Sequence, residues 1–214
     1  MCQKKMSAKQ KITCAALELF SQKGFTETSV REIAEAVGIR PSSLYTHFKS
    51  KASILEHLLD DYKQRYASKL VASETSWARL TKDATTDDIL ACFTIHFPKE
   101  STAHYLKMIV MLFQEQCRNE SVQSFMTKDL MFWHEEYVTA ILCRLVEVGA
   151  LDPEIDIDFW AKLHANINYA SMARYVLGIG ESTPAFKGKG IGDMKRALYD
   201  TIFQLHGTNR QGTP

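Results

Sequence analysis

The sequence lacks a long apolar run, an amino-terminal signal segment and a pattern of paired cysteines. No stretch approaches the roughly 20 apolar residues that span a bilayer, and the basic first residues lead into no apolar segment. Five cysteines, at positions 2, 14, 92, 117 and 143, are an odd number without paired spacing. These absences predict a protein of the reducing cytoplasm, with no membrane span, cofactor or metal.

Net charge is also low, at +1 for 214 residues, but it is unevenly distributed. Residues 1–51 hold nine Lys and Arg against four acidic residues, whereas the remainder holds 17 basic and 21 acidic residues. A basic segment of this kind is typical of a surface that faces nucleic-acid phosphates. The charge asymmetry therefore indicates that the amino-terminal part of the chain binds nucleic acid.

Strand patterns are absent as well, whereas apolar residues recur at helical spacing along most of the chain. Ser7 with Gln10 predicts a cap for a first helix, which Gly24 ends. The other expected helices span residues 30–37, 41–48, 51–71, 87–97, 100–117, 121–149, 156–178 and 192–206. Because the stretch 73–88 is polar, we expect a connection there. The sequence predicts an all-α protein.

Two of these helices are short and lie close together. Val30–Val37 and Pro41–Phe48 are joined by a turn that contains Gly38, which is typical of a helix-turn-helix. Ser29 and Glu32 have the spacing of a capping box, and Gly38 suits the left-handed end of a helix. A generic helical hairpin shares this spacing, so the spacing alone leaves both interpretations open.

Several motifs extend the comparison to a known family. The chain reads Gly24-Phe25, then TSVREIA from Thr28, Val37-Gly38-Ile39, and LYTHFKSK from Leu44. Over residues 7–59 this closely resembles the amino-terminal domain of TetR-type (tetracycline-repressor-like) bacterial regulators. The resemblance implies a three-helix DNA-binding domain in residues 1–51 and a larger helical domain for effector binding and dimerisation in residues 52–214. The helix after Ser50 would connect them.

The same resemblance implies which residues contact double-stranded DNA. They are Thr28, Ser29, Arg40, Pro41, Ser42, Ser43, Tyr45, Thr46, His47 and Lys51. Arg40, Ser42, Ser43 and Thr46 would reach base edges, and Arg40 suits a bidentate contact to guanine. Thr28, Ser29, Tyr45, His47 and Lys51 would contact the sugar-phosphate backbone. Alternative roles remain open, since Tyr45 suits packing, His47 suits a plain surface position and Arg40 suits a phosphate contact alone.

In the family the last two long helices pair with their copies in a four-helix dimer interface. Small and apolar residues suit that role here, namely Ala170, Ala173, Met194, Ala197, Leu198, Ile202 and Leu205. Packing within one chain is the alternative. A homodimer would place two recognition helices on a pseudo-palindromic operator.

The carboxy-terminal domain also has residues spaced to converge on a ligand cavity. They are Phe93, His96, Met108, Leu112, Gln116, Trp133, Tyr137, Asn166 and Tyr169. Aromatic walls with a few polar groups suit a small, largely apolar effector that releases a repressor from DNA. Two alternatives remain: these residues form plain core, or a protein partner controls the regulator instead of a small molecule.

Enzymatic patterns are incomplete. Cys92 and His96 have a spacing that suits metal binding, but no second pair completes the site. Gly188-Lys189-Gly190 lacks the earlier glycine and the following Ser or Thr of a phosphate-binding loop. The sequence therefore predicts a regulator that is not an enzyme.

Overall fold

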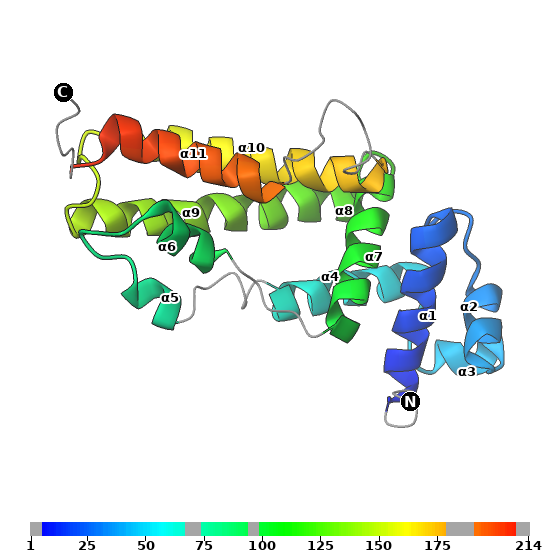
Figure 1. The fold of residues 1–214 in the computed structure, drawn as a ribbon. Helices are drawn as coiled ribbons and strands as arrows, with labels where there is room; N and C mark the ends of the chain where they lie inside the picture. Colours follow the sequence, from blue (N-terminus) through cyan, green and yellow to red (C-terminus); the bar gives the residue numbers. More distant parts are fainter. Residues whose placement is uncertain (1–5, 67–73, 94–98, 179–190, 209–214) are drawn as a thin grey trace. The chain divides into compact units, whose positions relative to one another are not determined.

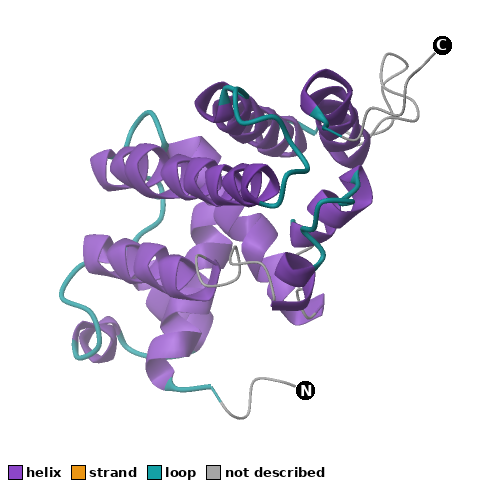
Figure 2. Cartoon of the chain, turned by 90° about the vertical axis from the view of Figure 1, so that its left-hand side faces the viewer, coloured by secondary structure: helices purple, strands orange, loops and turns teal. Residues whose placement is uncertain are grey.

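The computed structural model describes residues 6–66, 74–93, 99–178 and 191–208. In these ranges the regular elements are helices, joined by turns and one isolated β-bridge between Leu151 and Gly207 (Figure 1, Figure 2). The all-α prediction is confirmed. No helix in the described ranges has both the length and the apolar character needed to cross a membrane.

The chain packs as two compact units. Unit 1 comprises residues 1–66 and 97–127, and unit 2 comprises residues 67–96 and 128–214. The division in packing therefore does not fall at residue 51, because α4 (Lys51–Tyr66), α7 (Lys99–Glu115) and α8 (Glu120–Ser124) share unit 1 with the amino-terminal helices. A functional boundary between residues 51 and 52 remains a prediction.

Unit 1 begins with α1 (Ala8–Lys23), α2 (Val30–Val37) and α3 (Pro41–Tyr45). The capping boxes of α1 and α2 form as predicted, and Gly38 ends α2 with a left-handed φ of 75°. The third helix ends at Tyr45 and not at Phe48, because the N–H of His47 donates to the Leu44 carbonyl in a tighter turn. Local capping thus fixes where the helices of the helix-turn-helix begin and end.

A common core holds the helices of unit 1 together. The first helix lies against α2, α4 and α7, and its side chains Ile12, Leu17 and Phe20 are fully buried. Ile33 of α2 and Leu44 of α3 are equally buried. Burial of this kind stabilises the unit by roughly 1.5–3 kcal/mol per large side chain, so α3 is anchored by one apolar residue on its inner side.

Unit 2 contains α5 (Glu74–Ala78), α6 (Thr86–Cys92), α9 (Met131–Glu147), α10 (Ile157–Val176) and α11 (Ile191–His206). The helix predicted for residues 121–149 is present as α8, a π-helix at Phe125–Leu130, and α9. Helix α10 lies beside α9 and α11, and α11 also packs on α6 (Figure 1). The sequence did not predict α5, since its residues lie in a polar stretch.

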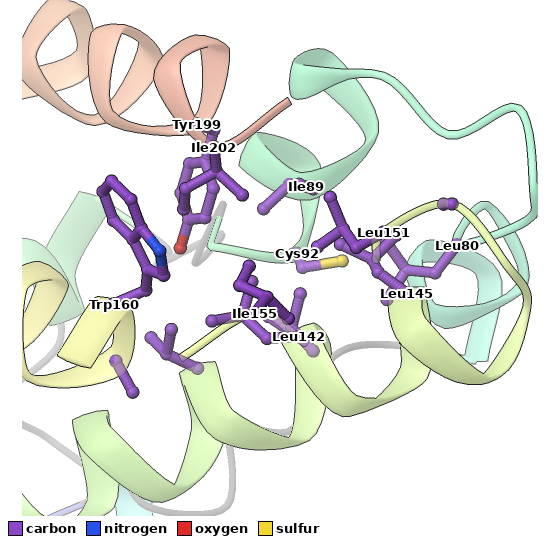
Figure 3. Packing of buried hydrophobic residues seen from close by; sticks show 14 of the residues in the cluster. Leu80, Ile89, Cys92, Leu142, Leu145, Leu151, Ile155, Trp160, Tyr199 and Ile202 are labelled. Carbon is purple, nitrogen blue, oxygen red and sulfur yellow. The ribbon is translucent and has the colours of Figure 1, made fainter. Parts of the chain in front are cut away.

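The core of unit 2 gathers side chains from all five helices or their flanks. Ile89 and Cys92 come from α6, Trp160 from α10, and Tyr199 and Ile202 from α11 (Figure 3). Figure 3 also shows the hydroxyl oxygen of Tyr199 pointing into this cluster. A tyrosine that is completely buried needs a hydrogen-bond partner for that hydroxyl.

Two residues predicted to face a dimer partner belong to this core instead. Leu198 is 7% exposed and Ile202 is completely buried within the single chain. Both lie on the side of α11 that packs against α6 and α10. The apolar stripe predicted on this helix therefore serves intrachain packing at these two positions.

Candidate nucleic-acid interface

The outer side of the helix-turn-helix is polar and exposed. Seven of the ten predicted DNA contacts are exposed on α3 or its flanks, and we call them the reading surface: Arg40, Pro41, Ser42, Ser43, Tyr45, Thr46 and His47. Tyr45 is 54% exposed, although tyrosine is usually buried or half-buried. An aromatic ring held on a polar surface suits contact with a partner, which disfavours a packing role for Tyr45.

Local structure explains why this surface stays available. Pro41 occupies the first turn of α3, where a missing N–H costs nothing, and Arg40 precedes it without making a side-chain cap. The hydroxyl of Thr46 donates to the Ser43 carbonyl at 2.7 Å, which fixes its orientation. Leu44 and Phe48 are buried and fix the inner side of the segment.

At the start of α2, Ser29 is exposed but its hydroxyl belongs to the cap. It accepts from the Glu32 N–H at 3.2 Å and donates to Glu32 Oε2 at 2.8 Å. Glu32 also pairs with Lys23, and this bond, followed by those from Ser29, lowers the pKa of Glu32 to about 2. A phosphate at Ser29 would therefore compete with an ionised carboxylate.

Thr28 differs from the prediction. Its side chain is only 1% exposed, and Oγ1 donates to the Gly24 carbonyl at 2.8 Å. The side chain thus closes the loop between α1 and α2 instead of facing solvent and a phosphate.

Lys51 is also engaged within the protein. Its ammonium donates to the carbonyls of Phe25, Thr26 and Thr28 at 2.7, 3.1 and 2.7 Å, and it lies 4.4 Å from the centroid of the Phe25 ring. An ammonium has three N–H donors, so these carbonyls occupy them all. Burial lowers the pKa of Lys51, with Glu115, Glu27 and Glu32 acting in the opposite direction. Lys51 holds the loop in this conformation, whereas the prediction had it contact a phosphate.

A buried glutamate holds the same loop from the other side. Glu115, at the end of α7, is 3% exposed and accepts from the Phe25 N–H at 2.8 Å. A Cβ at Gly24 would lie 3.0 Å from Glu115 Oε1, and Gly24 has a φ of 89° that favours glycine. We call Lys51 and Glu115 the loop clamp.

Sequence reasoning missed Glu115 because it lies 90 positions from Phe25. One signal was present, since Met108, Leu112 and Glu115 have the spacing of one helical face and all three are buried. An acidic residue on an apolar face needs a partner in the fold. That pattern identifies a buried glutamate but not the loop that it binds.

The nine predicted effector residues divide between the two units. His96 lies outside the described residues, Met108, Leu112 and Gln116 belong to α7 in unit 1, and the remaining five, Phe93, Trp133, Tyr137, Asn166 and Tyr169, belong to unit 2. Asn166 is exposed and its Nδ2 donates to the Lys162 carbonyl at 2.9 Å.

Within unit 2 two of the predicted residues are in contact. The rings of Phe93 and Tyr137 meet edge to face with centroids 5.5 Å apart, and the Tyr137 hydroxyl donates to the Cys92 carbonyl at 2.6 Å. Phe93 also stacks on His164 and Tyr199, which sequence reasoning did not select. The helical stripe of α10 was a signal for His164, since it lies four residues after Trp160 and both are buried.

A groove of about 420 Å³ lies beside α1 and α2 in unit 1. None of the predicted effector residues lines it. This groove does not test the predicted effector cavity, which stays a prediction.

The predicted dimer residues that reach the surface are fewer than the sequence suggested. Ala170, Ala197 and Leu205 are exposed, the last at 53%, while Ala173 and Met194 are partly buried. Large exposed apolar side chains on α10 and just beyond its end, Phe159, Tyr175 and Leu177, were not predicted.

The residues that suggested an enzyme have no supporting geometry in the described ranges. Burial raises the pKa of the Cys92 thiol to about 11, which disfavours the thiolate that a nucleophile needs. No group of three or more His, Cys, Asp or Glu residues with metal-binding geometry occurs among the residues that the structure describes. Gly188-Lys189-Gly190 lies outside those ranges.

Comparisons with known proteins relate the amino-terminal helices to a family of regulators. Residues 12–58 match the family described as bacterial regulatory proteins, tetR family. The chain is 36% identical over 86 residues to the probable HTH-type transcriptional regulator YttP of Bacillus subtilis, a match that covers 40% of each chain. It is 25% identical over 183 residues to the HTH-type transcriptional repressor KstR2 of Mycolicibacterium smegmatis, covering 80% of this chain and 81% of that protein.

A solved structure extends the similarity to the whole fold. The fatty acid degradation regulator FadR of Bacillus halodurans has a TM-score of 0.64 and 15% identity, with 98% of this chain and 100% of that chain covered. The match to YttP spans less than two thirds of either chain.

Proposed function

The chain belongs to the TetR family of bacterial regulatory proteins, and we propose that it is a homodimeric transcriptional repressor of the cytoplasm. It binds a pseudo-palindromic DNA operator, and a small, largely apolar effector releases it. The observation that carries the proposal is the reading surface, seven exposed residues on α3 and its flanks, in a segment that the buried side chains Leu44 and Phe48 anchor to unit 1.

The reading surface suits the chemistry of a DNA groove. The guanidinium of Arg40 and the hydroxyls of Ser42 and Ser43 are hydrogen-bonding groups that fit base edges, while Tyr45 and His47 suit the sugar-phosphate backbone. The excess of basic residues in residues 1–51 supplies the sequence-independent part of the affinity. This division of roles predicts that Tyr45 affects all DNA binding and Arg40 affects sequence preference.

Dimerisation follows from the small size of α3. Five helical residues read too few base pairs for a specific site, and a two-fold axis doubles the number that is read. The exposed side chains Ala170, Ala197 and Leu205, with Leu177 at 70% exposure, supply an apolar surface on α10 and α11 that a second copy would cover.

Regulation then requires that an effector bind two conformations of the protein with different affinity. Operator affinity falls by the ratio of those affinities, whichever elements move. The aromatic contacts among Phe93, Tyr137 and Tyr199 in unit 2 support an effector with an apolar body.

A gel-shift titration with DNA from the promoter region of its own gene tests this function. We expect a salt-sensitive, sequence-selective complex of two protomers, and we expect Tyr45→Ala to weaken binding to every sequence. Tyr175→Ala is the matched control, because this tyrosine is 50% exposed but lies in unit 2. Equal loss of binding in both variants, or no selectivity in the parent protein, would show the proposal to be wrong.

A further inference from the structure

A buried histidine in unit 2 has one nitrogen without a partner. His164 on α10 is completely buried, and its Nδ1 lies 2.9 Å from the hydroxyl oxygen of Tyr199. Its Nε2 is buried as well, and no hydrogen-bond partner meets it in the part of the chain that the structure describes. A polar atom left in this state costs free energy, so its presence calls for an explanation.

The pairing with Tyr199 indicates which proton His164 carries. If the phenol donates to Nδ1, then Nε2 bears a hydrogen and is a donor that lacks an acceptor. If Nδ1 donates instead, then both the phenol hydrogen and Nε2 lack partners. The first arrangement leaves fewer buried groups unsatisfied, and it makes Nε2–H a donor without a described acceptor.

A cation lies close to this donor. The ammonium of Lys195 on α11 lies 5.4 Å from the centroid of the Phe93 ring, and the same ring stacks on His164 with centroids 4.5 Å apart. Burial lowers the pKa of Lys195 to about 8, and no described carboxylate forms an ion pair with it. The ammonium is therefore mostly charged at neutral pH but is unusually poor in compensating charge.

His164 itself stays neutral in this environment. Burial is the largest cause that lowers its pKa, to about 2, and the nearby basic groups Lys195 and His134 act in the same direction. His134 is held by its own bond, in which Nδ1 lies 2.8 Å from the Leu130 carbonyl oxygen. The cluster thus presents one positive charge, from Lys195, beside one neutral donor.

We propose that His164 and Lys195 form an anion-binding site inside unit 2, and that the effector is a monocarboxylate with an apolar or aromatic body. Its carboxylate accepts from His164 Nε2–H and from the Lys195 ammonium, while Phe93 and Tyr137, which are only partly buried, contact the body. This inference rests on the proposed function, because it names the chemical class of the effector.

The charge balance selects a monoanion over more highly charged ligands. One carboxylate neutralises the single ammonium, whereas a phosphate dianion would leave a buried negative charge without a partner. A neutral alcohol of the same shape would satisfy the His164 donor but would leave the Lys195 charge uncompensated. The site therefore discriminates acids from alcohols mainly through Lys195.

Two pairs of probes test this chemistry by isothermal titration calorimetry on the full chain. The acids are 2-naphthoate and decanoate, and their neutral counterparts are 2-naphthalenemethanol and decanol. We expect at least one acid to bind roughly tenfold or more tightly than its alcohol, which corresponds to about 1.4 kcal/mol. In Lys195→Met we expect that preference to vanish through weaker binding of the acid, with alcohol binding unchanged.

Lys162→Met is the matched control, because Lys162 lies on α10 but is exposed and paired with Asp158. It should keep the full acid preference. A second readout does not depend on a fold-sensitive substitution: nitrogen NMR of the parent protein should show His164 protonated at Nε2, and that resonance should move when the acid binds. Tyr199→Phe should alter the tautomer that the spectrum reports.

Three results would overturn the proposal: no acid probe binds, acid and alcohol bind equally, or Lys195→Met keeps the acid preference. The gel shift without any probe separates this outcome from failure of the proposed function. If the operator is bound but no acid is, then only the inference about the effector is wrong. If acids bind as expected but no operator is bound, the site stands and the repressor function falls.

Discussion

Replacing Lys51 with methionine separates two roles that this residue has been given. The resemblance to TetR-type regulators implies a phosphate contact, whereas the structure shows the ammonium bound to three loop carbonyls. Methionine keeps most of the aliphatic stem and removes the charge and the donors. The substitution therefore removes either a DNA contact or a constraint on the loop.

The expected loss of stability follows from the contacts. The two bonds of 2.7 Å, to the Phe25 and Thr28 carbonyls, are partly buried, and each contributes about 1 kcal/mol after allowance for exposure. The Thr26 carbonyl is exposed, so water replaces the ammonium there at little cost. The contact with the Phe25 ring adds about 0.5 kcal/mol. Lys51→Met should thus lower the free energy of unfolding by about 2–3 kcal/mol, which a typical domain tolerates.

DNA binding distinguishes the two roles more sharply than stability does. If Lys51 contacts a phosphate, the slope of log affinity against log salt becomes shallower by about 0.9 per protomer. If Lys51 positions the loop, affinity falls by roughly tenfold or more, because the loop must be ordered on binding, and the slope stays unchanged. Fluorescence anisotropy over a salt series, together with urea unfolding, measures both quantities.

Lys49→Met is the control, since Lys49 is an exposed lysine two residues away. Its free energy of unfolding should change by less than about 0.5 kcal/mol. The reasoning about the loop clamp is refuted if Lys51→Met is as stable as the parent protein and has a shallower salt slope.

Three further predictions concern the clamp, the buried lysine and the dimer surface. Glu115→Ala leaves the Phe25 N–H without its acceptor and should cost about 1–3 kcal/mol in urea unfolding, whereas the exposed neighbour Gln114→Ala should cost little. The folded-state pKa of Lys195 is lowered to about 8, so above that pH the unfolded chain binds more protons than the folded one, and the parent protein should gain stability between pH 8 and 10. Lys195→Met should lack this gain and should be more stable than the parent protein at pH 7. Thermal melts of both proteins at each pH measure the difference. Leu205→Asp should weaken dimerisation in analytical ultracentrifugation while the monomer stays folded, whereas Leu198→Asp should unfold unit 2 by circular dichroism, and a stable Leu198→Asp monomer would contradict its place in the core.

Local signals explain which parts of the fold the sequence predicted well. The cap pairs Ser7 with Gln10 and Ser29 with Glu32 lie three residues apart, and Gly38 needs only its own backbone angle, so no distant contact is required to place these helix ends. The reading surface follows in the same way, because the inward side of α3 is set by Leu44 and Phe48.

Contacts between distant segments explain what the sequence did not predict. The loop clamp joins Lys51 and Glu115 to one loop from far along the chain, and nothing next to either residue names that loop. The stripe on α11 showed that Leu198 and Ile202 are buried but not whether another chain or the same chain buries them. The pairing of His164 with Tyr199 likewise depends on how α10 and α11 pack.

Operator binding by the parent protein, with its stoichiometry, decides whether this chain is a dimeric DNA-binding regulator. We expect sedimentation of a mixture of protein and promoter DNA to yield a complex of two protomers on one pseudo-palindromic site, and excess non-specific DNA to fail to displace them. Shifting the spacing between the half-sites should abolish the complex, because a dimer fixes the distance between its two copies of α3. Binding of single protomers without regard to half-site spacing would show that the chain does not act as a dimeric repressor.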